Sequence, residues 1–521
     1  MKLVKSLMLS SAAGIIAVSG AQAADLPVKA KPVEYVRICS LYGAGFYYIP
    51  GTDTCLRLGG YLRAEVVAVG NSDWSGPNNG AGGANNRFSN GYTWRGRNDL
   101  FVDTRTATEY GVVRTYGEMT MSWTTDTYSG LGNGSTVYSL LGSSPAPNNA
   151  ASGAVAAGTI GVYYAYIQFA GFTIGKAISQ FSAPWQNYPG NNFDGLVGGG
   201  GAVTGVNQFT YTAQFGNGIS ASASIQDQTA YFQAGVVNLG LPLSLNIAPN
   251  PVGGAFGISD YAGTMAPDIV GGFTVDQAWG LFQFSAAAHD NHVAYYSAFE
   301  TSGHPSDKWG WAVQAALQIK NIPTGPGDNI NIQGVYTSAA TRYNIQDLSN
   351  MGAVTMYNGT SNPFAYQKIT VGFAPDTVFA NNGQGQQAIN TWGMRGAFNH
   401  NWDPYWSSAL YGAWAQISYS GGAKALACNT SGIGVQGAVE RGDAIIFNCN
   451  PDYQVAQVGF IHRWTPVKNL TFSGDVVWTY VDQKYQGFLT TSSTSIGKPP
   501  AVYVLGNAGN VTALLRAQRN F

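Results

Sequence analysis

A two-residue alternation between apolar and polar side chains constrains the fold of this chain more than any other feature. From Gln208 the sequence reads Gln-Phe-Thr-Tyr-Thr-Ala-Gln-Phe, then Gly-Asn-Gly, then Ile-Ser-Ala-Ser-Ala-Ser-Ile-Gln, ending at Gln226. Because successive side chains of a β-strand point to opposite faces, the pattern predicts two strands, each with one apolar and one polar face. Asn217-Gly218 is typical of the tight turn that joins such strands in a hairpin.

The same period recurs elsewhere, with charged residues on the polar face. Arg63 and Glu65 alternate with Leu, Ala and Val, and Arg114 and Glu118 alternate with Val, Thr and Met. A soluble β-sandwich also shows this alternation, with its polar face in water. Periodicity alone therefore leaves both a soluble sandwich and a barrel open.

Composition and hydropathy favour a barrel that spans a membrane. Charged residues make up 10% of the chain, whereas an ordinary soluble domain carries ~25%. After residue 23 no run of sequence approaches the ~18 consecutive apolar residues that a membrane helix needs. A chain that crosses a membrane without such helices must close its strands into a barrel, because only closure satisfies every backbone N–H and C=O in hydrocarbon.

Connection lengths indicate the type of barrel. Short turns such as Ala170-Gly171 join some predicted strands, whereas long Gly/Asn/Ser/Pro-rich stretches at 70–92, 125–158, 180–205 and 344–386 join others. Outer-membrane barrels have such an asymmetry, with short periplasmic turns and long outer loops. Most tryptophans fall near predicted strand ends or turns, as in an interfacial aromatic girdle. With ~10 residues per strand, we predict an all-β fold, a transmembrane antiparallel β-barrel of about 16 strands.

The first 23 residues predict export. Two lysines precede an apolar run from Leu7 to Val18, and the small residues of Ala21-Gln22-Ala23 follow, so residues 1–23 are expected to be a cleaved signal peptide. The expected location is the bacterial outer membrane, with its lipid as a partner. Removing the two lysines leaves 24 of the 26 basic residues against 27 acidic ones, a formal charge of −3. This charge argues against nucleic acid as a partner.

The four cysteines fall into two local pairs, Cys39 with Cys55 and Cys428 with Cys449. Four cysteines allow three pairings. An oxidising compartment stabilises disulfides, and short loops close at a lower entropic cost, so we predict the two local disulfides. Free buried thiols are the alternative, which the polar Gly/Asn-rich sequence around both pairs disfavours.

Several blocks in order along the whole chain carry a family resemblance. They are Val33-Glu34-Tyr35-Val36-Arg37-Ile38-Cys39, Tyr42-Gly43-Ala44-Gly45-Phe46, Thr54-Cys55-Leu56-Arg57, Tyr116-Gly117-Glu118, Phe172-Thr173-Ile174-Gly175-Lys176 and Trp464-Thr465-Pro466-Val467-Lys468-Asn469-Leu470. These blocks, with the cysteine spacing of the first ones, resemble the porins of alphaproteobacteria. The resemblance implies a sixteen-stranded barrel, a homotrimer, and passive diffusion of small hydrophilic solutes and ions through a water-filled channel. No cofactor is expected.

The expected organisation has three parts. After the signal peptide, residues 24–55 form a disulfide-closed N-terminal segment, and residues 56–521 form the barrel. By resemblance, the segment near 179–206 is the outer loop that folds into the barrel and narrows it.

The charged faces of the predicted strands identify candidate pore residues. The segment from Arg95 to Arg105 carries its charges at odd positions, opposite an apolar even face. Arginine at the bilayer midplane of a barrel costs ~2–4 kcal/mol, so the odd face must line the lumen. The predicted pore-lining residues on this and the neighbouring strands are Arg63, Glu65, Arg95, Arg97, Asp103, Arg105, Arg114 and Glu118.

The constriction loop contributes one acid. Asp194 is the only carboxylate between Ser179 and Val206. Arginines facing a carboxylate across a constriction set up a transverse field that sorts solutes by charge. The alternative is that Asp194 only caps a turn. Lys176 is a further candidate, although its parity groups it with Phe172 and Ile174. Because bases outnumber acids, we expect a weak preference for anions.

Other functional classes find little support. His289-Asp290-Asn291-His292 is a close histidine pair with no third ligand nearby, so no metal site is expected. An outer-membrane barrel enzyme would need a Ser and a His on adjacent lipid-facing strands; His400 and His462 lie beside tryptophans near turns instead. An adhesin would show tandem repeats. A substrate-specific channel, for example for sugars, remains the main alternative and would need a continuous aromatic track along the lumen.

Overall fold

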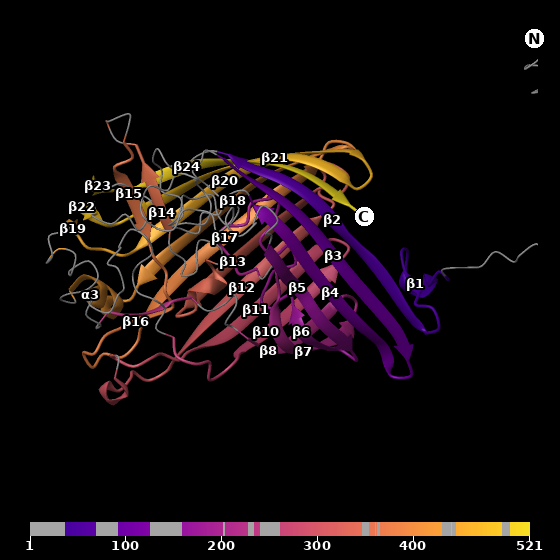
Figure 1. Cartoon of the computed structure of the whole chain (residues 1–521), viewed down its shortest axis with the longest axis horizontal. Coiled ribbons are helices and arrows are strands. Elements are labelled where there is room, and N and C mark those ends of the chain that lie inside the picture. The colour runs from indigo at the N-terminus through magenta and orange to yellow at the C-terminus, as the bar shows by residue number, and fades with distance from the viewer. Residues whose placement is uncertain are drawn as a thin grey trace, which may run out of the picture.

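In the computed structural model the chain forms one closed antiparallel β-barrel (Figure 1). The structure describes residues 37–68, 92–124, 159–201, 204–227, 234–239, 261–297, 299–345, 354–359, 361, 365–429, 439, 444–491 and 501–521. The expected signal peptide, the expected loop 125–158 and nearly all of the expected loop 70–92 lie outside these residues.

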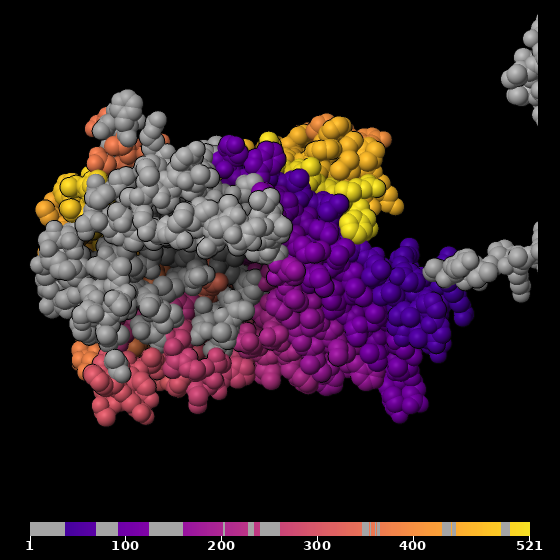
Figure 2. Space-filling view, viewed as in Figure 1, coloured from indigo at the N-terminus to yellow at the C-terminus, as the bar shows by residue number. Residues whose placement is uncertain are grey.

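Sixteen strands form the barrel, as the sequence predicted. They are β2 (Thr54–Ala68), β3 (Tyr92–Thr108), β4 (Gly111–Thr124), β5 (Thr159–Phe169), β6 (Phe172–Ala177), β7 (Val206–Gly216), β8 (Ile219–Gln226), β10 (Asp268–Gln277), β11 (Gly280–Asn291), β12 (Lys308–Lys320), β13 (Asn329–Ser338), β17 (Gln387–Asn401), β18 (Trp406–Tyr419), β20 (Tyr453–Val467), β21 (Leu470–Gln483) and β24 (Ala508–Asn520). Each pairs antiparallel with the next, and β24 pairs with β2 to close the barrel. In Figure 2 the yellow C-terminal strand lies against the indigo N-terminal one.

The predicted hairpin is present as β7 and β8. Gln208 pairs with Gln226, and the strands turn at Asn217 and Gly218, whose φ angles are 49° and 71°. Positive φ at both positions is what a tight hairpin turn of this kind requires, and Asn-Gly adopts it at little cost. The alternation therefore fixes both the strands and their register.

Long connections gather at one end of the barrel and short turns at the other (Figure 1). The long ones carry β9 (Val236–Asn238), η2 (Glu300–Ser302), η3 (Thr341–Tyr343), β14 (Val354–Asn358), β15 (Lys368–Gly372), β16 (Thr377–Phe379), α3 (Gly421–Asn429), β19 (Ala444–Asn448), β22 (Gln486–Thr491) and β23 (Ala501–Leu505). At the opposite end lie η1 (Ser40–Tyr42) and β1 (Tyr47–Tyr48). In the described part of the chain, no helix is both long enough and apolar enough to cross a membrane.

Some of the long connections form a second sheet at the long-loop end of the barrel. Its order is β14-β15-β23-β22-β19, so three different loops contribute to it. Tyr357, Ile369, Leu489 and Tyr503 form part of its buried core. The sequence predicted an irregular loop at 344–386, whereas β14, β15 and β16 lie there. β14 pairs with β15 in a local hairpin, and β15 and β16 also pair with the distant β23 and β9. The Gly/Asn-rich composition of the segment did not reveal these short strands.

The outer wall of the barrel is apolar and carries aromatic residues near both ends. Leu62, Leu100 and Leu515 are exposed on outward-facing positions. Trp309 and Trp311 lie where β12 leaves the long-loop end, and Trp402 lies in the turn between β17 and β18. This distribution matches the lipid-facing band and its two interfacial girdles.

Both predicted disulfides are confirmed, Cys39 with Cys55 and Cys428 with Cys449. Cys39, Cys55 and Phe46 form a small buried cluster beneath the short-turn end of the barrel. The guanidinium groups of Arg57 and Arg105 lie over the Phe46 ring, 5.3 Å and 4.9 Å from its centroid. The described part of the N-terminal segment, residues 37–55, is thereby fixed to β2 and β3.

Candidate functional site

A group of arginines surrounds Glu65 on the inward face of β2, β3 and β24. The Glu65 carboxylate, 0% exposed, lies 2.5 Å from Arg95 Nη2 and 2.7 Å from Arg516 Nε. Arg63 Nε is 3.3 Å away. Three guanidinium groups thus share one buried carboxylate, which leaves this part of the wall with a surplus of positive charge.

A second group, nearer the short-turn end, also consists of three arginines around one carboxylate. Asp103, also 0% exposed, lies 3.0 Å from Arg114 Nε, 3.1 Å from Arg105 Nη2 and 4.0 Å from Arg57 Nη2. These three arginines are each partly exposed. The sequence pointed to Arg105 and Arg114 but not to Arg57, which lies on β2 directly opposite Asp103.

Arg97 and Glu118 lie on the same inward face but not in these ion-pair groups. Arg97 Nε donates to Ser122 Oγ at 2.9 Å, and its guanidinium lies 5.7 Å from the centre of the Tyr163 ring. Glu118 Oε2 accepts a 2.5 Å hydrogen bond from the Tyr116 hydroxyl. The Tyr116 ring belongs to an inward-facing aromatic cluster: its centroid is 5.8 Å from that of Phe101, 6.1 Å from that of Tyr164 and 5.4 Å from that of Tyr166.

The connection from β6 to β7, residues 178–205, crosses the barrel and binds the opposite wall. Amide side chains of that wall donate to its backbone carbonyls: Gln283 to Ser182, Gln314 to Phe181, Asn331 to Pro189 and Gln457 to Gly195, at 2.7–3.1 Å. The carboxylate of Asp475 accepts the Asn192 backbone N–H at 2.6 Å. The loop is thus held along much of its length by side chains from β11, β12, β13, β20 and β21.

Three arginines that the sequence reasoning missed also hold this loop. Arg395 on β17, 2% exposed, donates to the Gln186 carbonyl at 2.5 Å and to the Leu196 carbonyl at 3.1 Å. Arg463 and Arg516 donate to the carbonyls of Gly190 and Asn192. All three sit on the inward parity of their strands. The alternation rule that identified Arg95 and Arg97 would have found them.

The two remaining candidates, Asp194 and Lys176, occupy different positions. Asp194 accepts a hydrogen bond from the Tyr188 hydroxyl of its own loop, and it also interacts electrostatically with Arg97 and Arg516. Its carboxylate therefore lies on the side of the loop that faces the arginine-bearing wall, which is formed by the inward faces of β2, β3 and β4. Lys176 Nζ donates to the carbonyls of Tyr163 and Thr204, at the base of the loop. It binds backbone there, and no hydrogen bond or ion pair within the described residues joins it to a carboxylate.

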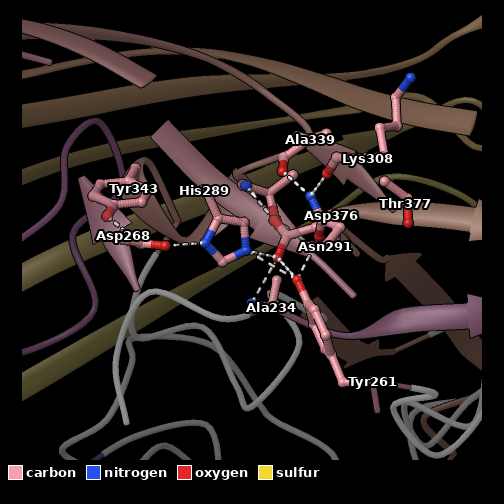
Figure 3. A network of polar contacts seen from close by, with 12 residues as sticks. Ala234, Tyr261, Asp268, His289, Asn291, Lys308, Ala339, Tyr343, Asp376 and Thr377 are labelled. Carbon is pink, nitrogen blue, oxygen red and sulfur yellow. Dashed lines mark hydrogen bonds and ion pairs between the residues drawn. The ribbon is translucent and has the colours of Figure 1, made fainter. Parts of the chain in front are cut away.

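At the long-loop end, His289 lies in a buried polar network (Figure 3). Its Nδ1 is 2.9 Å from Asp268 Oδ1, and its Nε2 is 3.0 Å from the Tyr261 hydroxyl. Asp376 lies beside it, with Oδ2 3.5 Å from Nε2 and 2.9 Å from the Ala234 backbone nitrogen. The network ties two long connections, the one from β8 to β10 and the one from β13 to β17, to β10 and β11.

Two other histidines, His292 and His462, lie apart from this network. His292 Nδ1 lies 2.8 Å from Asp307 on a partly exposed loop, so it does not point toward His289's partners. His462 stacks on Trp406 with centroids 4.9 Å apart, on the outer surface. Over the described ranges, no three His, Cys, Asp or Glu residues come together in a way that could hold a metal ion.

Comparison with known proteins places this geometry in a family. A family model described as "Porin subfamily" matches residues 25–506. Porin Omp2b of Brucella suis biovar 1 (strain 1330) is 33% identical over 343 residues, covering 65% of this chain and 75% of that protein. Porin Omp2a of Brucella melitensis biotype 1 is 32% identical over 343 residues, again covering 65% of this chain and 75% of that protein. The outer membrane channel DcaP of Acinetobacter baumannii has a similar fold, with a TM-score of 0.50, 14% identity, and coverage of 91% of this chain and 99% of that one.

The sequence, the barrel and the comparisons agree. The alternation closes into sixteen antiparallel strands, the charged faces turn inward, and the family match covers almost the whole chain. This chain belongs to the porin subfamily, and it forms a general porin channel in the bacterial outer membrane.

Proposed function

We propose that the narrowest part of the channel lies between loop 178–205 and the inward faces of β2, β3 and β4. The supporting observation is that this loop binds the opposite wall through its backbone, while the charges of β2–β4 pair mainly with one another. Ions and small hydrophilic solutes then pass along the arginine-bearing wall by passive diffusion, with no catalytic step.

A weak preference for anions follows from the charge of that wall. Glu65 and Asp103 are each shared by three arginines, and Asp194 is the only carboxylate of the facing loop. Fixed positive charge in a narrow aqueous pore raises the local concentration of anions.

The test is the reversal potential across a planar bilayer that separates two KCl concentrations. We expect the sign of the reversal potential to show that chloride permeates faster than potassium. In Arg97→Gln the reversal potential should have the same sign and a smaller magnitude. Lys468→Gln, in the turn between β20 and β21, is the control and should match the unmodified protein. A reversal potential of the opposite sign would contradict anion preference.

A substrate-specific channel is the second candidate, favoured by the inward-facing cluster of Phe101, Tyr116, Tyr164 and Tyr166. Aromatic rings along a lumen can stack on sugar faces. If neutral sugars block the ion current saturably, and Tyr166→Ala relieves the block, this candidate replaces general diffusion. If the rate at which sugars enter liposomes in a swelling assay depends only on their size, and falls as size increases, this candidate is excluded.

We also propose that three copies assemble, as the family resemblance implies. An apolar groove on the outer wall, lined by Ala64, Trp94, Trp464, Gly474 and Leu515 among others, provides a surface that a neighbouring barrel could fill. Native mass spectrometry should give three chains per particle. Gly474→Trp should reduce that fraction, whereas Gly271→Trp, exposed elsewhere on the outer wall, should not. Single chains in detergent would contradict the trimer and leave the pore proposal untouched.

A further inference from the structure

Two carboxyl groups lie in contact on the inward face of the arginine-bearing wall. Glu118 on β4 pairs with Phe101 on β3, and Asp99 lies two residues from Phe101, so Asp99 and Glu118 are diagonal neighbours on one face. Their side chains are in hydrogen-bond contact. Asp99 is 2% exposed. The alternation along this strand places Asp99 on the inward face, although Asp99 is not among the predicted pore-lining residues.

The hydrogen-bond partners of this pair set it apart from the other acids of the wall. Glu118 Oε2 accepts from the Tyr116 hydroxyl. Asp99 Oδ2 is buried without a donor among the described residues. Glu65 and Asp103, in contrast, each have three guanidinium groups within 4.0 Å. The pair therefore lacks the ion pairs that stabilise its neighbours in their charged form.

An ionised carboxylate can only accept hydrogen bonds, so two ionised carboxylates in contact repel and cannot bond to each other. A proton held between them removes the repulsion and supplies the missing donor, as in other closely spaced carboxyl pairs. The diagonal placement of the two carboxyl groups and the missing donor at Asp99 therefore favour one proton for the pair.

We propose that Asp99 and Glu118 share one proton and that its release to the lumen water adds a negative charge beside Arg97, so that this pair determines how charge selectivity changes with pH. The proposal rests on the proposed function, because the wall must border the ion path. The pair acts on selectivity alone and leaves the channel open in both states.

The surroundings define what else could titrate or screen the pair. The charged and titratable groups that face it are Tyr61 and Arg63 on β2, Arg97 on β3, Tyr116 on β4, Tyr164 and Tyr166 on β5, and, through Arg97, Asp194 of the loop. The arginines keep their charge at every accessible pH. Because ordinary tyrosines titrate at about pH 10, the groups of this set whose charge can change at lower pH are the carboxyl pair and Asp194.

The experiment is the reversal potential in a KCl gradient, measured from acidic to alkaline pH. In the unmodified channel, the chloride-to-potassium permeability ratio should fall roughly twofold or more as the shared proton is lost, as expected for one unit charge within several ångströms of the path in water. Asp99→Asn and Glu118→Gln each leave a single carboxyl, so the transition of the shared proton should disappear and any remaining change should occur only at the acidic pH where an isolated carboxyl titrates. Asp276→Asn, which removes an exposed carboxylate paired with Lys320, should follow the unmodified profile.

Three further measurements keep the outcome clear. Infrared difference spectra should show the C=O band of a protonated carboxyl in the unmodified protein at neutral pH, and Asp99→Asn should remove it. Resistance of the barrel to detergent before heating reports folding of every variant. Calcium, added alone, should not block the current; a block abolished by Asp99→Asn would make the pair a cation site and overturn the shared proton.

The result that would contradict the proposal is a permeability ratio that is flat with pH in the unmodified channel, or one whose pH profile survives both substitutions. A protein that inserts without conducting would instead contradict the proposed function. The two failures are therefore distinguishable.

Discussion

The two sides of the lumen use polar side chains in different ways. On β2, β3 and β4, charged side chains bind mainly one another, as in the groups around Glu65 and Asp103. On the side from β11 to β21, polar side chains bind the backbone of loop 178–205, and many of them are neutral amides such as Gln314 and Gln457. Water reaches the partly exposed arginines around Asp103, whereas the second set is covered by the loop.

The difference follows from the cost of burial. A buried polar group must be hydrogen-bonded, and a buried charge costs more than a buried amide unless it is paired. Amide donors satisfy loop carbonyls without that cost. We therefore expect substitutions on the covered side to reduce stability, and substitutions on the arginine-bearing side to change ion selectivity with little loss of stability.

The largest effect should come from the network at the long-loop end of the covered side. His289→Ala leaves Asp268 and Asp376 buried without their shared partner, which should lower the free energy of unfolding by about 3–5 kcal/mol. Unfolding in denaturant, followed by tryptophan fluorescence, measures it. His292→Ala removes only a partly exposed contact with Asp307 and is the matched control. Equal stability of the two variants would contradict the role assigned to the network.

Arg395→Ala should have the next largest effect. It removes the donor to the Gln186 and Leu196 carbonyls, at a cost of about 1–3 kcal/mol, and frees that part of the loop. Single-channel conductance should rise and become noisier. Arg519→Ala at the exposed short-turn rim should leave the conductance unchanged. A quiet channel of unmodified conductance in Arg395→Ala would show that other contacts suffice to hold the loop.

Much of this architecture could be predicted from the sequence. Period-two alternation predicted the hairpin 208–226 and the inward face from Arg95 to Arg105. Which side chains of a strand point to the same face depends only on the sequence of that strand. The strands within 344–386 were not predicted. They are short, and the local hairpin of β14 and β15 becomes part of a larger sheet only through β23, more than a hundred residues away. The contacts of Arg395 and Asp376 likewise depend on which loop covers which wall.

A smaller effect is expected on the arginine-bearing side. Arg97→Gln removes a charge that is hydrogen-bonded to Ser122 and faces Asp194, so chloride preference should fall while the free energy of unfolding changes by less than about 1 kcal/mol. Reversal potential and denaturant unfolding are measured on the same preparation. A loss of stability as large as that of Arg395→Ala would remove the distinction between the two sides.

The most local effect concerns Asp328, in the turn between β12 and β13. Burial would raise the pKa of its carboxyl, but hydrogen bonds from Thr324, the Asn401 backbone N–H and His400 lower the pKa to about 2. Because this pKa lies below the ordinary value of 3.8, the stabilisation is complete above about pH 4 and is lost as the pH falls through about 2. Hydrogen exchange at residues 321–328 should accelerate over that interval. Asp328→Asn should show fast exchange at neutral pH already.

Thiol accessibility tests most directly the claim that ions pass along the arginine-bearing wall and not behind the loop. All four cysteines are in disulfides, so Arg97→Cys and Gln333→Cys each introduce one free thiol. Gln333 is 1% exposed and accepts from Trp185 of the loop at 2.6 Å. A charged, thiol-reactive reagent added to the conducting channel should reduce the current through Arg97→Cys within seconds and leave Gln333→Cys unaffected. Reduction of the current in Gln333→Cys alone would place the ion path on the other side of the loop.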